Sequence, residues 1–183
     1  MQKTYKTEVI IIKTFDMGET DRRLTVFSRR LGKLIVIAKG VRKINSRRAP
    51  YLDLFSHLTL FLSRGRTFDI ITDVAPLNVF SKIRENLPSI AVAFHMAELT
   101  DRLLPERFPQ LQIFSRLLHD LIILNSVKNA QLKALCDNYG LFLLWELGYL
   151  PPATVLTGSK LDRFLEEVME KKIESSRLLT KLS

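Results

Sequence analysis

The 183-residue sequence contains one cysteine and three histidines, which limits the redox and metal chemistry that it can support. With Cys136 alone, no intramolecular disulfide and no multi-cysteine zinc site can form. The sequence also has no Walker A loop and no glycine-rich dinucleotide-binding loop. Because no nucleophile, metal-ligand set or phosphate loop is present, we predict no catalytic residues, no metal site and no cofactor, and therefore no enzyme.

Long hydrophobic runs are also absent. The apolar run Val9–Ile12 is far too short for the hydrophobic region of a signal peptide or for a membrane-spanning helix. Hydrophobic residues make up 46% of the chain and charged residues 26%, as in globular proteins. We therefore expect a cytoplasmic protein that does not associate with membranes.

Acidic residues are missing from one stretch in particular. The net charge is +9, and residues 1–66 carry 15 Lys/Arg against 5 Asp/Glu, whereas residues 67–183 carry 13 against 14. Ordinary solvated surfaces intersperse both signs, yet no acid occurs between Arg22 and Arg48. Phosphate backbones attract such clusters because each neutralised phosphate releases counterions. The predicted nucleic-acid-binding cations are Arg22, Arg23, Arg29, Arg30, Lys33, Lys39, Arg42, Lys43, Arg47 and Arg48.

Several aromatic residues lie in the same part of the chain, namely Phe15, Phe27, Tyr51, Phe55, Phe61 and Phe68. Phenylalanines at alternating positions of a small barrel belong mostly to its core. Tyr51 and Phe55 follow the basic stretch directly, and we predict that these two rings stack on nucleobases.

The first 75 residues have the two-residue periodicity of strands. Five strands are predicted, at Glu8–Phe15, Arg23–Ser28, Leu34–Ala38, Leu58–Leu62 and Phe68–Thr72, with a long polar connection after the third. This grouping of three and then two strands fits a five-stranded OB-fold barrel, and another small barrel fits nearly as well.

From Leu87 the periodicity changes to that of helices. The first apolar stripe is Val92, Met96, Leu99 and Leu103; the second runs from Leu111 through Phe114, Leu117 and Leu121 to Leu124; the third from Leu132 through Leu135, Tyr139 and Phe142 to Leu147. A fourth helix begins near Ser159, and a short last one covers Glu174–Leu182. The predicted fold class is α+β: an OB-fold nucleic-acid-binding domain over residues 1–78, and an all-α domain for partner docking over residues 79–183.

Other candidate sites have simpler interpretations. Asp16, Glu19 and Asp21 have the chemistry of magnesium ligands but are typical of a polar turn. A di-metal site needs carboxylate and histidine pairs on several helices, and His95 with Glu98 supplies only one. Cys136 lies on an apolar helical stripe and is predicted to be a small core residue.

Four N-terminal segments together with two later ones resemble the RecO family of bacterial recombination mediators. The N-terminal segments are Glu8–Lys13, Gly18–Arg22, Phe27–Lys33 and Ala38–Arg42, and the later ones are Glu98–Leu104 and Phe142–Pro151. Their order and spacing carry the resemblance, which extends from about Glu8 to Pro152.

The resemblance implies an OB-fold followed by a helical domain. It further implies binding to single- and double-stranded DNA, annealing of complementary strands, and help for RecA in loading, together with RecR, onto strands coated by single-strand-binding protein. RecO proteins commonly carry four zinc-binding cysteines just after the segment that matches Gly148–Pro151, and this sequence has none there. Zinc is therefore not expected.

Partner docking is expected on the helical domain. The acidic C-terminal tail of single-strand-binding protein suits an apolar groove with an arginine rim, for which Arg102, Arg107 and Arg116 are candidates. Two alternatives remain at this point: an RNA- or ribosome-associated OB protein, and an adaptor that binds an acidic protein tail and no DNA.

Overall fold

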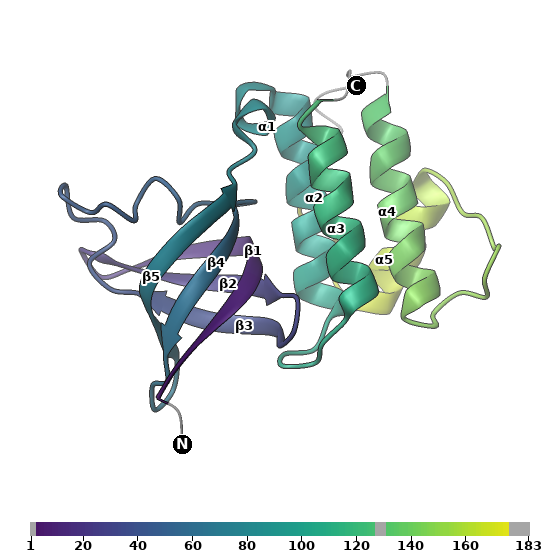
Figure 1. Ribbon diagram of the computed structural model, residues 1–183. Helices are drawn as coiled ribbons and strands as arrows, with labels where there is room; N and C mark the ends of the chain where they lie inside the picture. The colour runs from purple at the N-terminus through teal and green to yellow at the C-terminus, as the bar shows by residue number, and fades with distance from the viewer. Residues whose placement is uncertain (1–2, 127–130, 176–183) are drawn as a thin grey trace. The chain divides into compact units, whose positions relative to one another are not determined.

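The computed structural model describes residues 3–126 and 131–175 and contains five strands and five helices within them. The strands are β1 (Thr4–Met17), β2 (Asp21–Ser28), β3 (Gly32–Ala38), β4 (His57–Ser63) and β5 (Asp69–Asn78). The helices are α1 (Ser81–Glu85), α2 (Leu87–Leu103), α3 (Leu111–Leu124), α4 (Leu132–Glu146) and α5 (Ser159–Met169). Figure 1 shows the strands followed by the helices, so the predicted α+β class is confirmed.

The five strands form a closed barrel in the order β1-β2-β3-β5-β4, in which β4 also pairs with β1. Four of the pairings are antiparallel. The fifth, between β3 and β5, is parallel and joins only Val36 to Asp69 and Ile37 to Ile70. Closure removes the free edges of the sheet, and this topology is that of the OB-fold, as the sequence predicted.

Strand β1 takes part in both of its pairings because it is long and irregular. The register of β1 against β2 shifts between Ile11 and Lys13, which leaves Ile12 as an extra residue. Such a bulge bends a strand and increases its twist. Val9 and Ile11 belong to the barrel core, whereas Lys13 and Phe15, beyond the bulge, are exposed.

The barrel core consists of alternating apolar side chains, as the period of two predicts. Leu52 and Val41, from the connection between β3 and β4, join this core and are 0% and 1% exposed. From the strands it contains Val9, Ile11, Leu24, Val26, Leu34, Val36, Ala38, Leu58, Leu60, Leu62 and Ile71.

A segment from later in the chain packs on the outside of the barrel. Residues 104–114 belong to the same compact unit as the barrel. The Phe114 ring lies 5.7 Å from that of Phe27, and the Arg107 amide donates to the Lys33 carbonyl at 2.9 Å. At Gly32 (φ +73°), a Cβ atom would lie 2.3 Å from the carbonyl oxygen of Phe108. Only glycine therefore allows this approach.

The second compact unit comprises Phe80–Leu103 and the chain from Ser115 onward. Val92, Met96 and Leu99 of α2 are buried, as the first predicted stripe requires. Gly140 of α4 brings three helices together, because a Cβ there would meet Leu165 at 3.2 Å, Leu99 at 3.6 Å and Leu161 at 3.7 Å.

The structure departs from the expected helices in a few places. Helix α1 was not predicted, and Leu111 is 51% exposed because it begins α3 instead of continuing the apolar stripe. The two units divide after Val79, and residues 104–114 go with the barrel. The short helix expected over 174–182 lies mostly outside the described residues. No helix in the described ranges combines the length and apolar character that crossing a bilayer requires.

Candidate nucleic-acid interface

The connection between β3 and β4 carries the densest group of cations and is fixed to the barrel along its length. Figure 1 shows it as a long loop beside the strands. Near its start, the Arg42 amide donates to the Thr20 carbonyl at 2.9 Å, and the Gly40 amide donates to Asp21 Oδ1 at 2.8 Å. At its end, the Phe55 amide donates to the Ile11 carbonyl at 2.8 Å. Because both ends and Leu52 are held, residues 42–47 project at a defined position.

Arg48 fastens this connection to two strands. Its guanidinium donates to the carbonyl oxygens of Ile71 at 2.7 Å and Lys39 at 2.9 Å, and more weakly to that of Thr72 at 3.4 Å. Lys39 directly follows β3, and Ile71 lies in β5. Arg48 therefore spans the short parallel pairing that closes the barrel, and its donors are largely used within the protein.

Two further arginines of the predicted set are paired with one carboxylate. Arg22 Nε lies 3.0 Å from Asp16 Oδ1, and Arg42 Nε lies 3.5 Å from Asp16 Oδ2. Arg22 also donates to the Leu52 carbonyl at 3.2 Å, and Arg42 to the Gly18 carbonyl at 3.0 Å. Asp16 thus offsets part of the positive charge, and these arginines order the β1–β2 turn against the long connection.

The remaining cations on this side are exposed. Lys39, Lys43 and Arg47 lie in the connection with exposed side chains, and Arg42 is exposed as well although it is paired with Asp16. Arg30 is exposed in the turn between β2 and β3, at the opposite end of that hairpin. Ile44, between Lys43 and Asn45, is fully exposed as well. These cations are placed where phosphate groups can reach them.

The carboxylate of Asp21 supports the start of the same connection. The hydrogen bond from the Gly40 amide lowers the pKa of Asp21 most, with smaller contributions from Thr20 and the charges of Lys39 and Lys43. Asp21 therefore remains ionised well below neutral pH and keeps its bond to Gly40.

A cation and an aromatic ring meet on the outside of β1 and β2. The Arg23 guanidinium carbon lies 5.0 Å from the centre of the Phe15 ring, and the two residues are direct cross-strand partners. Phe15 is 58% exposed. Arg23 in turn is opposite Ile37 of β3. OB-fold faces that bind single strands commonly combine exposed aromatic rings with nearby cations.

Sequence reasoning assigned Phe15 to the core with the other phenylalanines. The signal that identifies it is the alternation Lys13, Phe15, Met17 beyond the buried isoleucines, once a bulge is placed at Ile12. Asp16, the partner of two arginines, was likewise treated as part of a polar turn.

The two predicted stacking residues differ in exposure. Tyr51 is 36% exposed and remains a candidate. Phe55 is 4% exposed and takes a left-handed conformation (φ 66°) where the connection returns to β1. This burial removes Phe55 from the proposed interface, because a stacked base needs an exposed ring face.

On the β2–β3 side the rest of the predicted set is partly paired. Arg29 lies 3.1 Å from Glu8 Oε2, and His57 Nε2 lies 2.8 Å from Glu8 Oε1. Burial raises the pKa of Glu8, but the hydrogen bonds from His57 and Arg29 outweigh it and leave that pKa below its usual value. Lys33 lies in β3, where its carbonyl accepts from the Arg107 amide.

The three arginines predicted to bind a partner belong to two different units. Arg107 belongs with the barrel unit, whereas Arg102 and Arg116 belong with the helical unit. Arg116 lies 2.7 Å from Asp120 Oδ2 and 5.0 Å from the centre of the Phe142 ring. Arg102 contacts Glu98 and Glu174, each at 2.9 Å.

Within residues 3–126 and 131–175, no group of His, Cys, Asp or Glu side chains is arranged to hold a metal ion. Cys136 is buried in the helical core, as predicted, and burial raises the pKa of its thiol. A neutral, buried thiol is a poor nucleophile.

The class of this protein follows from the barrel: it is an OB-fold protein with a cationic connection after β3 and a helical unit. Residues 1–80 match the family model described as "Recombination protein O N terminal". The chain belongs to the RecO family.

Curated relatives extend the match beyond the barrel. The chain is 41% identical over 149 residues to DNA repair protein RecO of Roseiflexus sp. (strain RS-1), which is 81% of this chain and 52% of that protein. It is 33% identical over 147 residues to that of Desulfitobacterium hafniense (strain DCB-2), covering 80% and 53%. For Nocardioides sp. (strain JS614) the identity is 36% over 149 residues, covering 80% and 61%. The chain spans about half the length of these relatives.

Proposed function

We propose that this protein is a non-catalytic mediator of DNA repair and homologous recombination. In this proposal it binds single- and double-stranded DNA and anneals complementary strands. It also assists RecA in loading, together with RecR, onto strands coated by single-strand-binding protein. The relatives that the chain matches are named DNA repair protein RecO, which supports the repair role.

The observation that carries the proposal is the group of exposed cations on an anchored connection. Lys39, Lys43 and Arg47 are exposed, and no acidic residue occurs between Arg22 and Arg48. Because residues 40–55 are fixed at both ends, the side chains between them need little further ordering when they meet phosphates. The Phe15–Arg23 pair and Tyr51 add surfaces on which bases can stack.

The mechanism requires no bond chemistry. Two complementary strands repel each other because both are polyanions, and repulsion slows their annealing. A cationic surface that holds one strand lowers this repulsion and releases counterions. Arg102 and Arg116 are the proposed contacts for the acidic tail of single-strand-binding protein on the helical unit, and Arg107 is a third on the barrel unit.

The test is fluorescence anisotropy of a labelled single-stranded oligonucleotide across a salt series. If five phosphates are contacted, the slope of log K against log salt is about −3.5 for a single strand. Replacing Lys39, Lys43 and Arg47 together by Ala should flatten the slope by about 2. The matched control replaces Lys82, Lys160 and Arg163, which are exposed on helices α1 and α5, and should leave the slope unchanged.

Arg48→Ala is measured separately, because its donors bind carbonyl oxygens within the barrel. It should lower the unfolding temperature more than the salt slope. A slope near zero for the unchanged protein would reject DNA binding and favour an adaptor for acidic protein tails. Preference for structured RNA over single-stranded DNA would favour an RNA-associated OB protein instead.

A further inference from the structure

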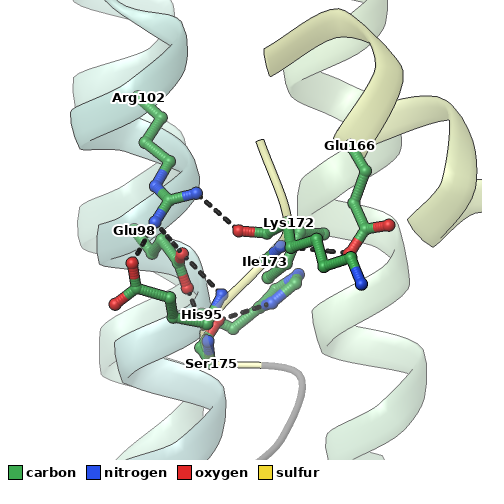
Figure 2. Close-up of polar contacts among 8 residues, drawn as sticks. His95, Glu98, Arg102, Glu166, Lys172, Ile173 and Ser175 are labelled. Carbon is green, nitrogen blue, oxygen red and sulfur yellow. Dashed lines mark hydrogen bonds and ion pairs between the residues drawn. The ribbon is translucent and has the colours of Figure 1, made fainter. Parts of the chain in front are cut away.

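After α5 the chain crosses helix α2 as an irregular segment, residues 172–175, here called the C-terminal strap. Figure 2 shows the strap beside His95, Glu98 and Arg102 of α2. These three residues are spaced by three and four positions, so they form one stripe of the helix surface. Ile173 is the apolar anchor of the strap and is 2% exposed.

The contacts of the strap are made mainly to its main chain. Glu98 accepts two consecutive amides, from Glu174 at 2.8 Å and Ser175 at 2.7 Å. Arg102 donates to the Lys172 carbonyl at 2.7 Å, and Glu166 of α5 accepts the Ile173 amide at 3.1 Å. Together these groups satisfy a run of main-chain donors and acceptors, and the two consecutive amides that point to one carboxylate show that the chain turns at Glu174 and Ser175.

Two side chains of the strap are recognised in addition. The Glu174 carboxylate, 83% exposed, lies 2.9 Å from Arg102, and the Ser175 hydroxyl is hydrogen-bonded to His95 Nδ1 at 3.1 Å. Burial raises the pKa of Glu98, but the bonds from Ser175 and Glu174 and the charge of Arg102 outweigh it, so Glu98 stays ionised.

The strap does not fill the space that it crosses. A cavity of about 400 Å³ is lined by Arg102 and by Lys171, Lys172, Ile173 and Glu174. Only one apolar side chain holds the strap, while Lys171, Lys172 and Glu174 are exposed. Segments with few buried apolar contacts open more readily than the core to which they are attached.

We propose that His95, Glu98 and Arg102 form a peptide-binding site that the strap occupies as an internal ligand. The external ligand of this site is a short peptide in which an aliphatic residue is followed directly by an acidic one. Glu98 accepts hydrogen bonds from two consecutive main-chain amides of that peptide, and Arg102 forms an ion pair with its side-chain carboxylate. The strap must leave before such a partner binds, so it restricts access to α2. This proposal does not depend on DNA binding.

The test uses the full chain and the peptide Lys-Lys-Ile-Glu-Ser, a copy of residues 171–175, added in an NMR titration that follows the amides of α2. A tethered strap competes at an effective concentration of roughly millimolar, so the unchanged protein should bind the peptide weakly. Ile173→Ser removes the anchor of the strap and leaves all three α2 residues intact. This variant should bind the peptide at least tenfold more tightly.

Two altered peptides serve as controls on the same variant. Lys-Lys-Ser-Glu-Ser lacks the aliphatic anchor, and Lys-Lys-Ile-Lys-Ser reverses the charge; each should bind at least tenfold more weakly. These comparisons leave the protein unchanged, so they do not depend on the folding of a further variant. Adding Arg102→Ala should abolish the preference for glutamate over lysine.

Equal binding of all three peptides, or no binding to the Ile173→Ser protein, would overturn the proposal. The strap would then be a fixed part of the helical unit. Loss of DNA binding in a separate assay would bear on the proposed DNA-binding role and not on this site, so DNA binding and peptide binding can fail independently.

Discussion

The two units of this protein satisfy their polar side chains in different ways. In the barrel unit, side chains bond mainly to main-chain groups: Arg48 to carbonyls of Ile71 and Lys39, and Asp21 to the Gly40 amide. In the helical unit, side-chain partners lie mainly on the same helix or on the segments that follow the helices, as in Arg116–Asp120 within α3 and Glu98 with the Glu174 amide. Helices satisfy their own main chain internally, whereas turns and connections leave main-chain groups that need partners.

The charge balance follows the same division. Arg102 and Arg116 each have a carboxylate four residues away on their own helix. The barrel part of the sequence has too few acids for its cations, so several cations remain exposed. The excess positive charge of the chain therefore lies in the barrel part of the sequence.

The largest expected effect is on stability, and it compares alanine substitutions at two glycines. At one the new Cβ would meet main-chain atoms, and at the other it would meet a side chain. Gly32→Ala should lower the free energy of unfolding by about 4 kcal/mol, because its Cβ meets the main chain of Phe108 and its φ is +73°. Gly140→Ala should change it by less than about 1 kcal/mol, because the nearest atom is a methyl group of Leu165, which can move. Urea unfolding checks both; equal losses would contradict the distinction.

The next effect concerns a buried histidine of the helical unit. Burial lowers the pKa of His95 from 6.5 to about 4, with Glu98 and Asp137 acting weakly in the opposite direction. Below pH 6.5 the unfolded chain therefore takes up a proton that the folded chain does not. The corresponding stability is fully present above pH 6.5 and is lost as pH falls toward 4, by about 3 kcal/mol.

This pH effect is measured by urea unfolding between pH 7 and 4. His95→Gln should remove that part of the loss, and the difference between the two profiles is the readout. His119→Gln, at a histidine whose side chain is 67% exposed, is the matched control and should leave the profile unchanged. Superimposable profiles for the His95 variant and the unchanged protein would contradict the assignment.

A smaller effect compares two buried hydroxyl pairs. Thr100 donates to the Met96 carbonyl at 2.7 Å, so the Tyr139 hydroxyl at 2.6 Å donates to Thr100. Thr100→Val leaves that buried hydroxyl without its acceptor and should cost about 2 kcal/mol. In the barrel, Thr7 lies 2.7 Å from the Ser28 hydroxyl, which also accepts main-chain amides of Arg30 and Leu31.

Thr7→Val removes the partner of the Ser28 hydroxyl proton, but Ser28 still accepts two main-chain amides, whereas Tyr139 would keep no partner; Thr7→Val should therefore cost less, about 1 kcal/mol. Thermal unfolding of the two valine variants gives the comparison. If Thr7→Val were the more destabilising change, the main-chain amides bound to Ser28 would not reduce the loss of stability.

The smallest effect tests the exposed ring of the proposed interface. Phe15→Ala should weaken binding of a single-stranded oligonucleotide about tenfold, which is within the range of one base stacked on an aromatic ring. Phe61→Ala, at a ring of β4 that is 36% exposed, should change binding less than twofold. Anisotropy at one fixed salt concentration measures both, and equal losses would remove Phe15 from the interface.

Local sequence patterns predicted the strands and the longer helices because burial repeats with a period of two or 3.6 residues. Val9, Ile11 and Leu24 fall in the barrel core, and Val92, Met96 and Leu99 in the helical core, as their spacing indicates. The cationic connection was also visible, because charge is read directly from sequence.

Features that depend on distant contacts were not visible. The packing of residues 104–114 on Gly32 joins segments some 70 residues apart, and no periodicity encodes it. The pairing of Arg22 and Arg42 with Asp16 depends on the bent path of β1. The burial of Phe55 depends on a return of the chain to Ile11. The strap on α2 likewise needs contacts across more than 70 residues.

Arg48 affects how easily the parallel pairing of β3 and β5, which closes the barrel, can open. The β3–β5 pairing has two residue pairs, and Arg48 adds a connection across it from the loop that carries the exposed cations. Separation of β3 from β5 therefore requires the hydrogen bonds of Arg48 to break. An anion bound to the loop should stabilise these bonds and slow hydrogen exchange at the Ile37 and Ile70 amides. We expect Arg48 to couple anion binding by this loop to opening of the β3–β5 pairing.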